Sequence, residues 1–439
     1  MPVARIAIDS RIVGPGDFFV AIRGERFDGH DFVAQAFESG ASGALVDREV
    51  TVPAGRLVIE AGDTTRALQA VARDVRRRSG AHVVAITGSA GKTTTKEVCA
   101  ELLSARYEVF RNKGNLNNHI GLPLSLLELR AGPEVAVVEL GMNHPGEIRT
   151  LVDIAEPEVR VWTNVGDAHI GFFDSADAIA DAKAEILEAA APDAVLVANA
   201  DDDRIMSRIS RFAGRTITFG IDREADVRAS AVDPRGLDGV TASVSTPAGG
   251  FRLESPLLGL GNLSNVLAAT AVAVTLDVPV DAIAARIRRL APAHHRGELL
   301  RLPGGITLID DSYNSSPAAL KRSLEIVGAA SGSARKVAVL GEMLELGSHA
   351  SRLHRECGAA AVRAKLDLLI AVGPVAAADL AAAARDAGMP AASVIHVPDR
   401  QAAAEETIRL ARPGDLVLVK GSRGIGLDLV VDRLKREFA

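Results

Sequence analysis

The stretch HVVAITGSAGKTTTKEVCAELL, residues 82–103, decides the fold of this chain. Its apolar start predicts a buried strand, the segment TGSAG predicts a tight turn, and KTTTKEVCAELL predicts an amphipathic helix. This order is typical of a phosphate-binding loop, because backbone N–H groups at the helix N-terminus face anionic oxygens. Lys92 would add a mobile cation, and the Thr93 hydroxyl is a suitable ligand for Mg²⁺.

The spacing of this loop differs from the general phosphate-loop pattern. Ile86 stands five residues before Gly91, and the nearest earlier glycine is Gly88. The pattern is therefore the shorter form Thr-Gly-x-x-Gly-Lys-Thr; the alternative is an ordinary Gly-Lys turn before a helix. The predicted nucleotide-binding residues of the loop are Thr87, Gly88, Ser89, Ala90, Gly91, Lys92, Thr93 and Thr94.

Length and composition limit the possible functions. At 439 residues the chain exceeds the roughly 250–300 residues of a single core, so two or three domains are expected. The 48% hydrophobic and 3% aromatic content favours helices packed on buried parallel strands. A net charge of −6 argues against broad nucleic-acid binding. The sequence contains no apolar leader segment and no long apolar run, so we expect a cytoplasmic protein without stable membrane insertion, with a monomer as the default.

Alternating strand and helix patterns predict an α/β fold in three domains. Residues 1–78 contain short apolar runs separated by turns, which indicate a small α/β module. Residues 79–292 contain longer apolar strands with helical segments between them, which predict a mostly parallel sheet; the part from 215 to 258 favours antiparallel strands. Residues 293–439 repeat the alternation and predict an open, Rossmann-like domain.

Polar side chains follow several of the predicted central strands. Glu139 ends the run AVVEL, Asp167 and His169 follow the next strand, and Lys183 lies on the following helix. Because parallel strands end at one edge of a sheet, these groups converge on the phosphate loop, where a carboxylate could hold Mg²⁺. The alternatives are a solvated glutamate, a structural histidine and a solvated lysine.

Two further groups of residues are suited to nucleoside recognition. Asn262 and Asn265 lie on one face of a predicted helix, where one could cap the helix and the other read an adenine edge. Asp310 and Asp311 end a strand, where a carboxylate could accept hydrogen bonds from ribose hydroxyls; an Asp-rich turn is the alternative.

A set of motifs covers essentially the whole chain: TGSAGKTTTKE, NLNNHIGLP, VVELGMNHPGEI, TNVGDAHIGFF, AKAEI, GLGNLSNVLAA, IDDSYNSSP, LGEMLELG and KGSRGIGL. Together they resemble the Mur ligases of peptidoglycan synthesis. NHPGEI, DDSYN-x-x-P and GEMLELG favour the branch that adds D-alanyl-D-alanine to UDP-N-acetylmuramoyl-tripeptide (UDP-MurNAc-tripeptide). The resemblance implies a UDP-binding domain, a central ATPase domain and a C-terminal domain that closes over the nucleotide. It also implies transfer of the ATP γ-phosphoryl group to a carboxylate, giving an acyl phosphate that the dipeptide amine attacks.

The resemblance also implies roles for particular residues. Lys92, Glu139, His169 and Lys183 would be catalytic. Thr93 and Glu139 would hold one Mg²⁺, His169 would help to hold a second metal ion, and a carbamylated Lys183 would approach Mg²⁺ and the γ-phosphate. Asn262, Arg296 and Asp311 would bind adenine, phosphates and ribose of ATP, respectively. The UDP-sugar and muramyl-peptide residues would be Ser10, Arg11, Gly24, Asp28, Gly29, His30, Asn115, Asn117 and Asn118.

The chain departs from the family pattern in several places. It reaches DSR at residues 9–11, where family members carry a longer leading segment, so a first strand or helix is expected to be absent. Gly261 stands where relatives often have His, and Ser-Ser-Pro follows DDSYN where relatives more often have Ala-Asn-Pro. The segment HHRGE matches the interdomain Arg motif only loosely.

Two rival interpretations remain open from the sequence. The first is a related ligase with another amino acceptor, although the Asp-Asn-Pro-Arg motif of the diaminopimelate-adding branch is absent from the sequence. The second is a non-catalytic nucleotide-binding relative, which predicts loss of the metal set, whereas all of its residues are present. The third residue of the accepted peptide is not determined by these motifs.

Overall fold

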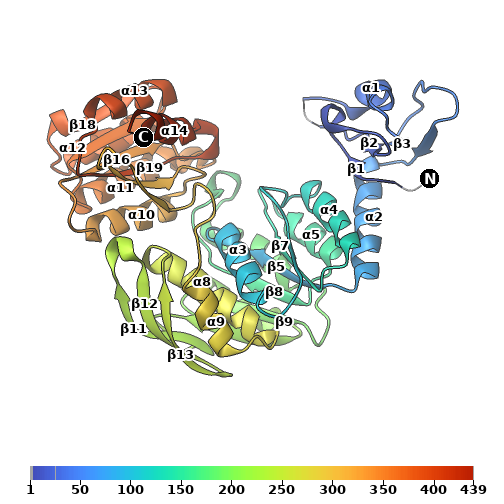
Figure 1. Cartoon of the computed structure of the whole chain (residues 1–439), viewed down its shortest axis with the longest axis horizontal. Coiled ribbons are helices and arrows are strands. Elements are labelled where there is room, and N and C mark those ends of the chain that lie inside the picture. Colours follow the sequence, from blue (N-terminus) through green and yellow to red (C-terminus); the bar gives the residue numbers. More distant parts are fainter. Residues whose placement is uncertain (1–2, 25, 439) are drawn as a thin grey trace.

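The structure is a computed structural model that describes residues 3–24 and 26–438. These residues form three α/β domains in chain order, each built on its own sheet (Figure 1). The central domain lies between the other two, and the long helix α2 (Thr64–Ser79) connects the N-terminal strands to it. The predicted fold class is therefore confirmed. Within the described residues, none of the helices has the length and apolar character needed to cross a membrane.

The N-terminal sheet is parallel, with strand order β1-β2-β3-β4. Its strands are β1 (Ile6–Ala7), β2 (Phe18–Val20), β3 (Gly43–Val46) and β4 (Leu57–Glu60), and α1 (Val33–Glu38) packs on it. The buried guanidinium of Arg76 on α2 donates hydrogen bonds to the carbonyl oxygens of Ala155 and Glu156, at 2.7 Å each. These bonds fix the C-terminal half of α2 to the central domain.

The central sheet has the strand order β13-β12-β11-β10-β9-β8-β5-β7-β6. Its strands are β5 (His82–Thr87), β6 (Val109–Arg111), β7 (Val135–Glu139), β8 (Val159–Trp162), β9 (Val195–Asn199), β10 (Arg215–Gly220), β11 (Val227–Pro234), β12 (Val240–Thr246) and β13 (Gly249–Ser255). The predicted antiparallel region is confirmed for β11–β13, but β10 pairs with β9 in parallel. The β10 strand extends the buried parallel sheet because Ile217 and Phe219 face its core.

The central helices cover both faces of this sheet (Figure 1). They are α3 (Lys92–Leu103), α4 (Gly121–Leu126), α5 (Glu147–Ala155), α6 (Ala176–Ala184), α7 (Asp203–Met206), α8 (Gly259–Thr275) and α9 (Val280–Ile287). Helices α3 and α8 pack against each other, and their apolar side chains form one core with the strands. This packing places the N-termini of both helices at the same end of the domain.

The C-terminal sheet has the order β14-β15-β19-β16-β17-β18 and is parallel except for β14. Its strands are β14 (Glu298–Arg301), β15 (Thr307–Asp311), β16 (Arg335–Gly341), β17 (Leu368–Val372), β18 (Val394–Val397) and β19 (Asp415–Lys420). Its helices are α10 (Pro317–Ala329), α11 (Ala350–Arg363), α12 (Ala376–Asp386), α13 (Arg400–Leu410) and α14 (Asp428–Glu437). Apolar, β-branched strands buried on both faces explain why the sheet is parallel.

Candidate nucleotide site between the central and C-terminal domains

The turn between β5 and α3 depends on two glycines. Gly91 precedes the first residue of α3 with a φ of 81°, in the left-handed region. A Cβ atom on Gly91 would overlap the amide oxygen of Asn265, and a Cβ atom on Gly88 would overlap the hydroxyl of Thr163. The turn therefore requires glycine at both positions, because neighbouring side chains occupy the space of a Cβ atom.

Lys92 folds back over this turn. Its Nζ donates a hydrogen bond to the carbonyl oxygen of Gly88 at 2.8 Å. Desolvation lowers the pKa of Lys92, the charge of Glu139 opposes this shift, and the charge of Arg296 adds to it. A cation crowded by a second cation is well placed to bind an anionic ligand.

Glu139 lies at the carboxyl end of β7 and is almost fully buried. One carboxylate oxygen accepts a hydrogen bond from the Thr93 hydroxyl at 2.7 Å, and the other accepts one from the Asn117 side-chain amide at 2.9 Å. The side chain of Asn112 accepts a hydrogen bond from the Glu139 backbone N–H at 3.1 Å. The structure thus brings together Thr93 and Glu139, which the sequence proposed as metal ligands, and holds the carboxylate in one orientation.

Asn164 is a supporting residue that the sequence reasoning missed. Its side chain pairs with the backbone of Ala90, accepting from the N–H and donating to the carbonyl oxygen at 2.9 Å each. The backbone N–H of Gly166 donates to the Ser89 hydroxyl at 2.9 Å. The segment after β8 therefore holds the phosphate loop in shape. The available signal was the dipeptide Thr-Asn at the end of an apolar strand.

His169 and Lys183 occupy different positions relative to the cleft. His169 lines the cleft, and its Nδ1 lies 2.6 Å from a carboxylate oxygen of Glu345, so the ring nitrogen donates to the carboxylate. This hydrogen bond lowers the pKa of Glu345. Lys183, on α6, is buried; desolvation lowers its pKa well below the ordinary value, the charge of Lys92 adds to this, and Glu139 opposes it.

The two asparagines of α8 touch each other beside the phosphate loop. The Asn262 amide donates to the carbonyl oxygen of Leu258 at 2.9 Å, and its side-chain oxygen accepts from Asn265 at 3.3 Å. Asn265 is buried and accepts from the Thr95 hydroxyl at 3.3 Å. Asn265 thus braces α3, while Asn262 is the more exposed of the pair and lines the cleft.

The C-terminal domain supplies the opposite wall. Asp311 accepts hydrogen bonds from the Ser323 hydroxyl at 2.8 Å and from the Lys420 ammonium at 2.7 Å. The guanidinium of Arg296 stacks on the ring of Tyr313, 4.2 Å from the ring centroid. Sequence reasoning assigned no role to Lys420 or Tyr313, because Lys420 lies 109 residues from Asp311 in the chain and no sequence pattern pairs Tyr313 with Arg296.

Buried polar groups support the loop at residues 342–346 on this wall. His354 Nε2 accepts the backbone N–H of Met343 at 2.9 Å, while its Nδ1 donates to the carbonyl oxygen of Ala350 at 2.7 Å. The Ser422 hydroxyl accepts the N–H of Leu344 at 2.9 Å. The His354 ring is therefore neutral, and burial lowers its pKa.

This histidine predicts a pH dependence of stability. Below about pH 6.5 the unfolded chain protonates His354 while the folded chain does not, so stability is lost as pH falls from there towards the folded-state pKa. Titration of His354 can change the free energy of unfolding by at most about 1.4 kcal/mol per pH unit. The free energy of unfolding, measured with urea, should fall more between pH 7.5 and pH 5.5 in the wild-type chain than in His354→Gln. An equal loss in both chains would contradict this role.

The central and C-terminal domains border an open cleft of about 990 Å³. Most of the residues predicted from the sequence to bind nucleotide, metal or the muramyl peptide line it: Ser89, Ala90, Gly91, Lys92, Thr93, Thr94, Asn115, Asn117, Asn118, Glu139, His169, Asn262, Arg296 and Asp311. Thr87, Gly88 and Lys183 do not line the cleft. The N–H groups of the first turn of α3, together with the cationic side chains of Lys92 and Arg296, make this cleft suitable for a phosphorylated ligand.

The predicted UDP-sugar residues lie in the N-terminal domain, apart from this cleft. Ser10 donates to the side chain of Gln35 at 3.0 Å, and Arg11 is exposed beside Asp9. His30 is buried, with Nδ1 2.6 Å from a carboxylate oxygen of Asp28.

The loop that carries these residues is tightly packed. The Nε2 atom of His30 accepts the backbone N–H of Asp47 at 3.0 Å. Gly29 packs so closely on the backbone of Ile22 that a Cβ atom would lie 2.6 Å from the Ile22 nitrogen, and the N–H of Gly24 donates to Phe27 at 2.9 Å. Asp28 and His30 therefore shape this loop, and Arg11 has the more accessible side chain.

Comparison with known proteins shows similarity to one family over most of the chain. Family models described as "Mur ligase family, catalytic domain", "Mur ligase middle domain" and "Mur ligase, glutamate ligase domain" match residues 2–107, 86–273 and 295–423. The UDP-N-acetylmuramoyl-tripeptide–D-alanyl-D-alanine ligase of Bacillus subtilis (strain 168) is 34% identical, over 98% of this chain and 92% of the relative.

Solved structures of similar proteins agree in fold over nearly the whole chain. MurF from Acinetobacter baumannii superposes with a TM-score of 0.90 at 32% identity, covering 99% of this chain and 94% of the other. MurF ligase from Thermotoga maritima, solved in complex with ADP, has a TM-score of 0.87 at 31% identity, with 99% and 97% covered. With matches of this extent in both sequence and structure, the chain belongs to the Mur ligase family.

Proposed function

We propose that this protein is the ATP-dependent ligase that adds D-alanyl-D-alanine to UDP-MurNAc-tripeptide. The observation that carries the proposal is the phosphate loop with Lys92 and the Thr93–Glu139 pair at the carboxyl edge of the central sheet, facing Arg296 and Asp311 across the cleft. The names of the relatives support UDP-MurNAc-tripeptide and D-alanyl-D-alanine as the two substrates that are joined.

ATP fits the two walls of the cleft. The N–H groups at the start of α3 and the Lys92 ammonium bind the β- and γ-phosphates, and Arg296 adds a second cation. Asn262 contacts adenine and Asp311 contacts the ribose. The ADP complex of the Thermotoga maritima relative supports nucleotide binding in this fold.

The donor set fits Mg²⁺ that keeps several water ligands. In the described part of the chain no group of three or more His, Cys, Asp and Glu side chains is arranged to hold a metal ion. The hydroxyl of Thr93 and the carboxylate of Glu139 are 2.7 Å apart, and Mg²⁺ is commonly held by one or two carboxylates plus substrate phosphates. His169 would help to hold a second metal ion, and a carbamylated Lys183 completes the proposed set. The ion would neutralise charge on the phosphates.

Carbamylation of Lys183 has a physical reason in this site. Carbon dioxide reacts with a neutral amine, and desolvation together with the charge of Lys92 favours the neutral form of Lys183. The product carries a negative charge beside Lys92, where an ammonium would be repelled. With release of one proton, the modification thus turns a neutral amine into an anionic oxygen ligand.

The chain promotes ligation by holding the tripeptide carboxylate close to the ATP phosphates. Lys92 and Arg296 reduce repulsion while the tripeptide carboxylate attacks the γ-phosphorus, which forms an acyl phosphate and releases ADP. The amine of D-alanyl-D-alanine then attacks the acyl carbon, forming the amide bond and releasing phosphate and a proton. Closing the cleft excludes water, which would otherwise hydrolyse the acyl phosphate.

The remaining assignments follow from this function. Residues 1–78 bind the UDP moiety, residues 79–292 bind ATP, and residues 293–439 close over the nucleotide. The UDP-MurNAc contacts would come from Ser10, Arg11, Gly24, Asp28, Gly29 and His30, and the peptide contacts from Asn115, Asn117 and Asn118. The protein would act as a monomer in the cytoplasm.

The deciding experiment measures phosphate release and product mass. The protein is incubated with ATP, Mg²⁺ and UDP-MurNAc-tripeptide, with and without D-alanyl-D-alanine. We expect release that depends on the dipeptide, and a product with the mass of the UDP-MurNAc-pentapeptide. Release with another amino acid would identify a ligase with a different acceptor, and binding of ATP without release under any condition would favour a non-catalytic relative.

A further inference from the structure

Two short segments of similar sequence meet between the central and C-terminal domains. His169-Ile170-Gly171 lies in the loop after β8, and Glu345-Leu346-Gly347 lies in the loop after β16. Each has a polar residue, an aliphatic residue and a glycine in the same order. We call these six residues the clasp.

Direct hydrogen bonds join the two segments. His169 Nδ1 donates to a carboxylate oxygen of Glu345 at 2.6 Å, and the backbone N–H of Gly171 donates to the Glu345 carbonyl oxygen at 2.9 Å. Glu345 therefore binds the central domain through both its side chain and its backbone. A shift of the C-terminal domain would break both bonds together.

The glycines allow the two backbones to touch. A Cβ atom on Gly171 would lie 2.6 Å from the nitrogen of Gly347 and 2.7 Å from the carbonyl oxygen of Glu345. A Cβ atom on Gly347 would lie 2.9 Å from the Cα of Gly171. Alanine at position 171 cannot be accommodated unless the two domains separate, since the obstructing atoms belong to backbone.

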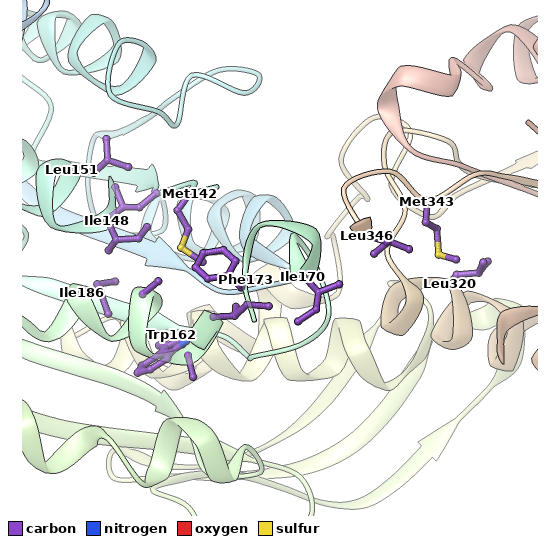
Figure 2. Packing of buried hydrophobic residues seen from close by; sticks show 14 of the residues in the cluster. Met142, Ile148, Leu151, Trp162, Ile170, Phe173, Ile186, Leu320, Met343 and Leu346 are labelled. Carbon is purple, nitrogen blue, oxygen red and sulfur yellow. The ribbon is translucent and has the colours of Figure 1, made fainter. Parts of the chain in front are cut away.

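Backbone strain and apolar packing point to the same contact. His169 and Glu345 have φ values of 68° and 64°, in the left-handed region that non-glycine residues rarely adopt and that tertiary contacts must enforce. The side chains of Ile170 and Leu346 are buried in one apolar cluster that spans both domains. Figure 2 shows Ile170 and Leu346 on facing segments, with Phe173 to the left of Ile170 and Met343 to the right of Leu346.

We propose that Glu345 is a positioning residue for His169, and that the clasp makes completion of the nucleotide site depend on docking of the C-terminal domain. The proposal rests on the proposed function. The Glu345 carboxylate holds the proton on Nδ1, so Nε2 is the ring nitrogen left for a ligand in the cleft. Because this carboxylate comes from the other domain, His169 is held in its orientation only when the domains are docked.

The first test separates the domains by steric overlap alone. Gly171→Ala is compared with Gly62→Ala, since neither glycine has a positive φ and a Cβ atom on Gly62 meets no atom within 4 Å. Fluorescence energy transfer between a label on the central domain and one on the C-terminal domain is measured with saturating ADP. We expect a longer distance for Gly171→Ala and the wild-type distance for Gly62→Ala. An unchanged distance for Gly171→Ala would overturn the clasp.

The second test addresses Glu345 itself. Glu345→Gln keeps a side-chain oxygen that accepts from Nδ1, whereas Glu345→Ala removes it. We expect kcat to fall about 10–100-fold in Glu345→Ala, the range for loss of a residue that orients a metal-binding histidine, and to recover substantially in Glu345→Gln. The KM for D-alanyl-D-alanine should stay constant. An equal kcat loss in both variants would exclude the positioning role.

The two tests also distinguish failure of this inference from failure of the proposed function. The distance between the domains with ADP bound does not depend on which amine the enzyme accepts. A changed distance in Gly171→Ala, in a protein that shows no ligase activity with D-alanyl-D-alanine, would support the clasp and reject the proposed acceptor.

Discussion

Replacing Lys183 with alanine is expected to reduce the rate of dipeptide-dependent phosphate release at least about 100-fold, the loss that follows removal of one charge-stabilising group from an enclosed site. The buried position of Lys183 and its lowered pKa, caused by desolvation and then by Lys92, favour the neutral amine that carbamylation needs. Turnover at saturating ATP and UDP-MurNAc-tripeptide is the measurement.

Chemical rescue distinguishes a carbamate from a structural lysine. Acetate or another short carboxylate should restore part of the activity of Lys183→Ala, because a small anion can enter the space left by the side chain. Lys183→Arg is the matched variant: it keeps a long basic side chain that fills the space but cannot be carbamylated, so it should be inactive and unresponsive to carboxylates. Full activity in either variant would remove Lys183 from the mechanism.

Gly91→Ala should weaken ADP binding by more than about tenfold, equal to at least about 1.4 kcal/mol. The new methyl group would overlap the side-chain oxygen of Asn265, in addition to the strain of a φ of 81°. The start of α3 must then move, and its N–H groups leave the positions that face the phosphates. Isothermal titration with ADP and Mg²⁺ measures the change.

Gly132→Ala is the control for this prediction. Its φ of 78° gives nearly the same backbone strain, but a Cβ atom there meets no atom within 4 Å. We expect a small loss of thermal stability and wild-type ADP affinity. Equal affinity in Gly91→Ala and Gly132→Ala would show that the phosphate loop tolerates a side chain at Gly91, against the structural argument.

Local sequence patterns predicted most of the fold. Alternation of apolar runs and helical segments indicated the three α/β domains. Residues 82–103 indicated the phosphate loop, because its whole pattern lies within one strand, one turn and one helix. Only β10 was assigned the wrong direction. The length and composition of β10 suit a parallel or an antiparallel strand. Its pairing with β9, and not its own sequence, makes it parallel.

The sequence by itself also indicated that Glu139, His169 and Lys183 converge on the phosphate loop, because parallel strands end at one edge. Tertiary structure alone decided what holds these groups. The pairing of Asn164 with Ala90 depends on two adjacent strands, and the contact of Glu345 with His169 joins positions 176 residues apart in different domains. No periodicity encodes such a contact, since it arises only when separate domains pack. The lowering of the pKa of Lys183 likewise requires burial, which only the folded chain provides.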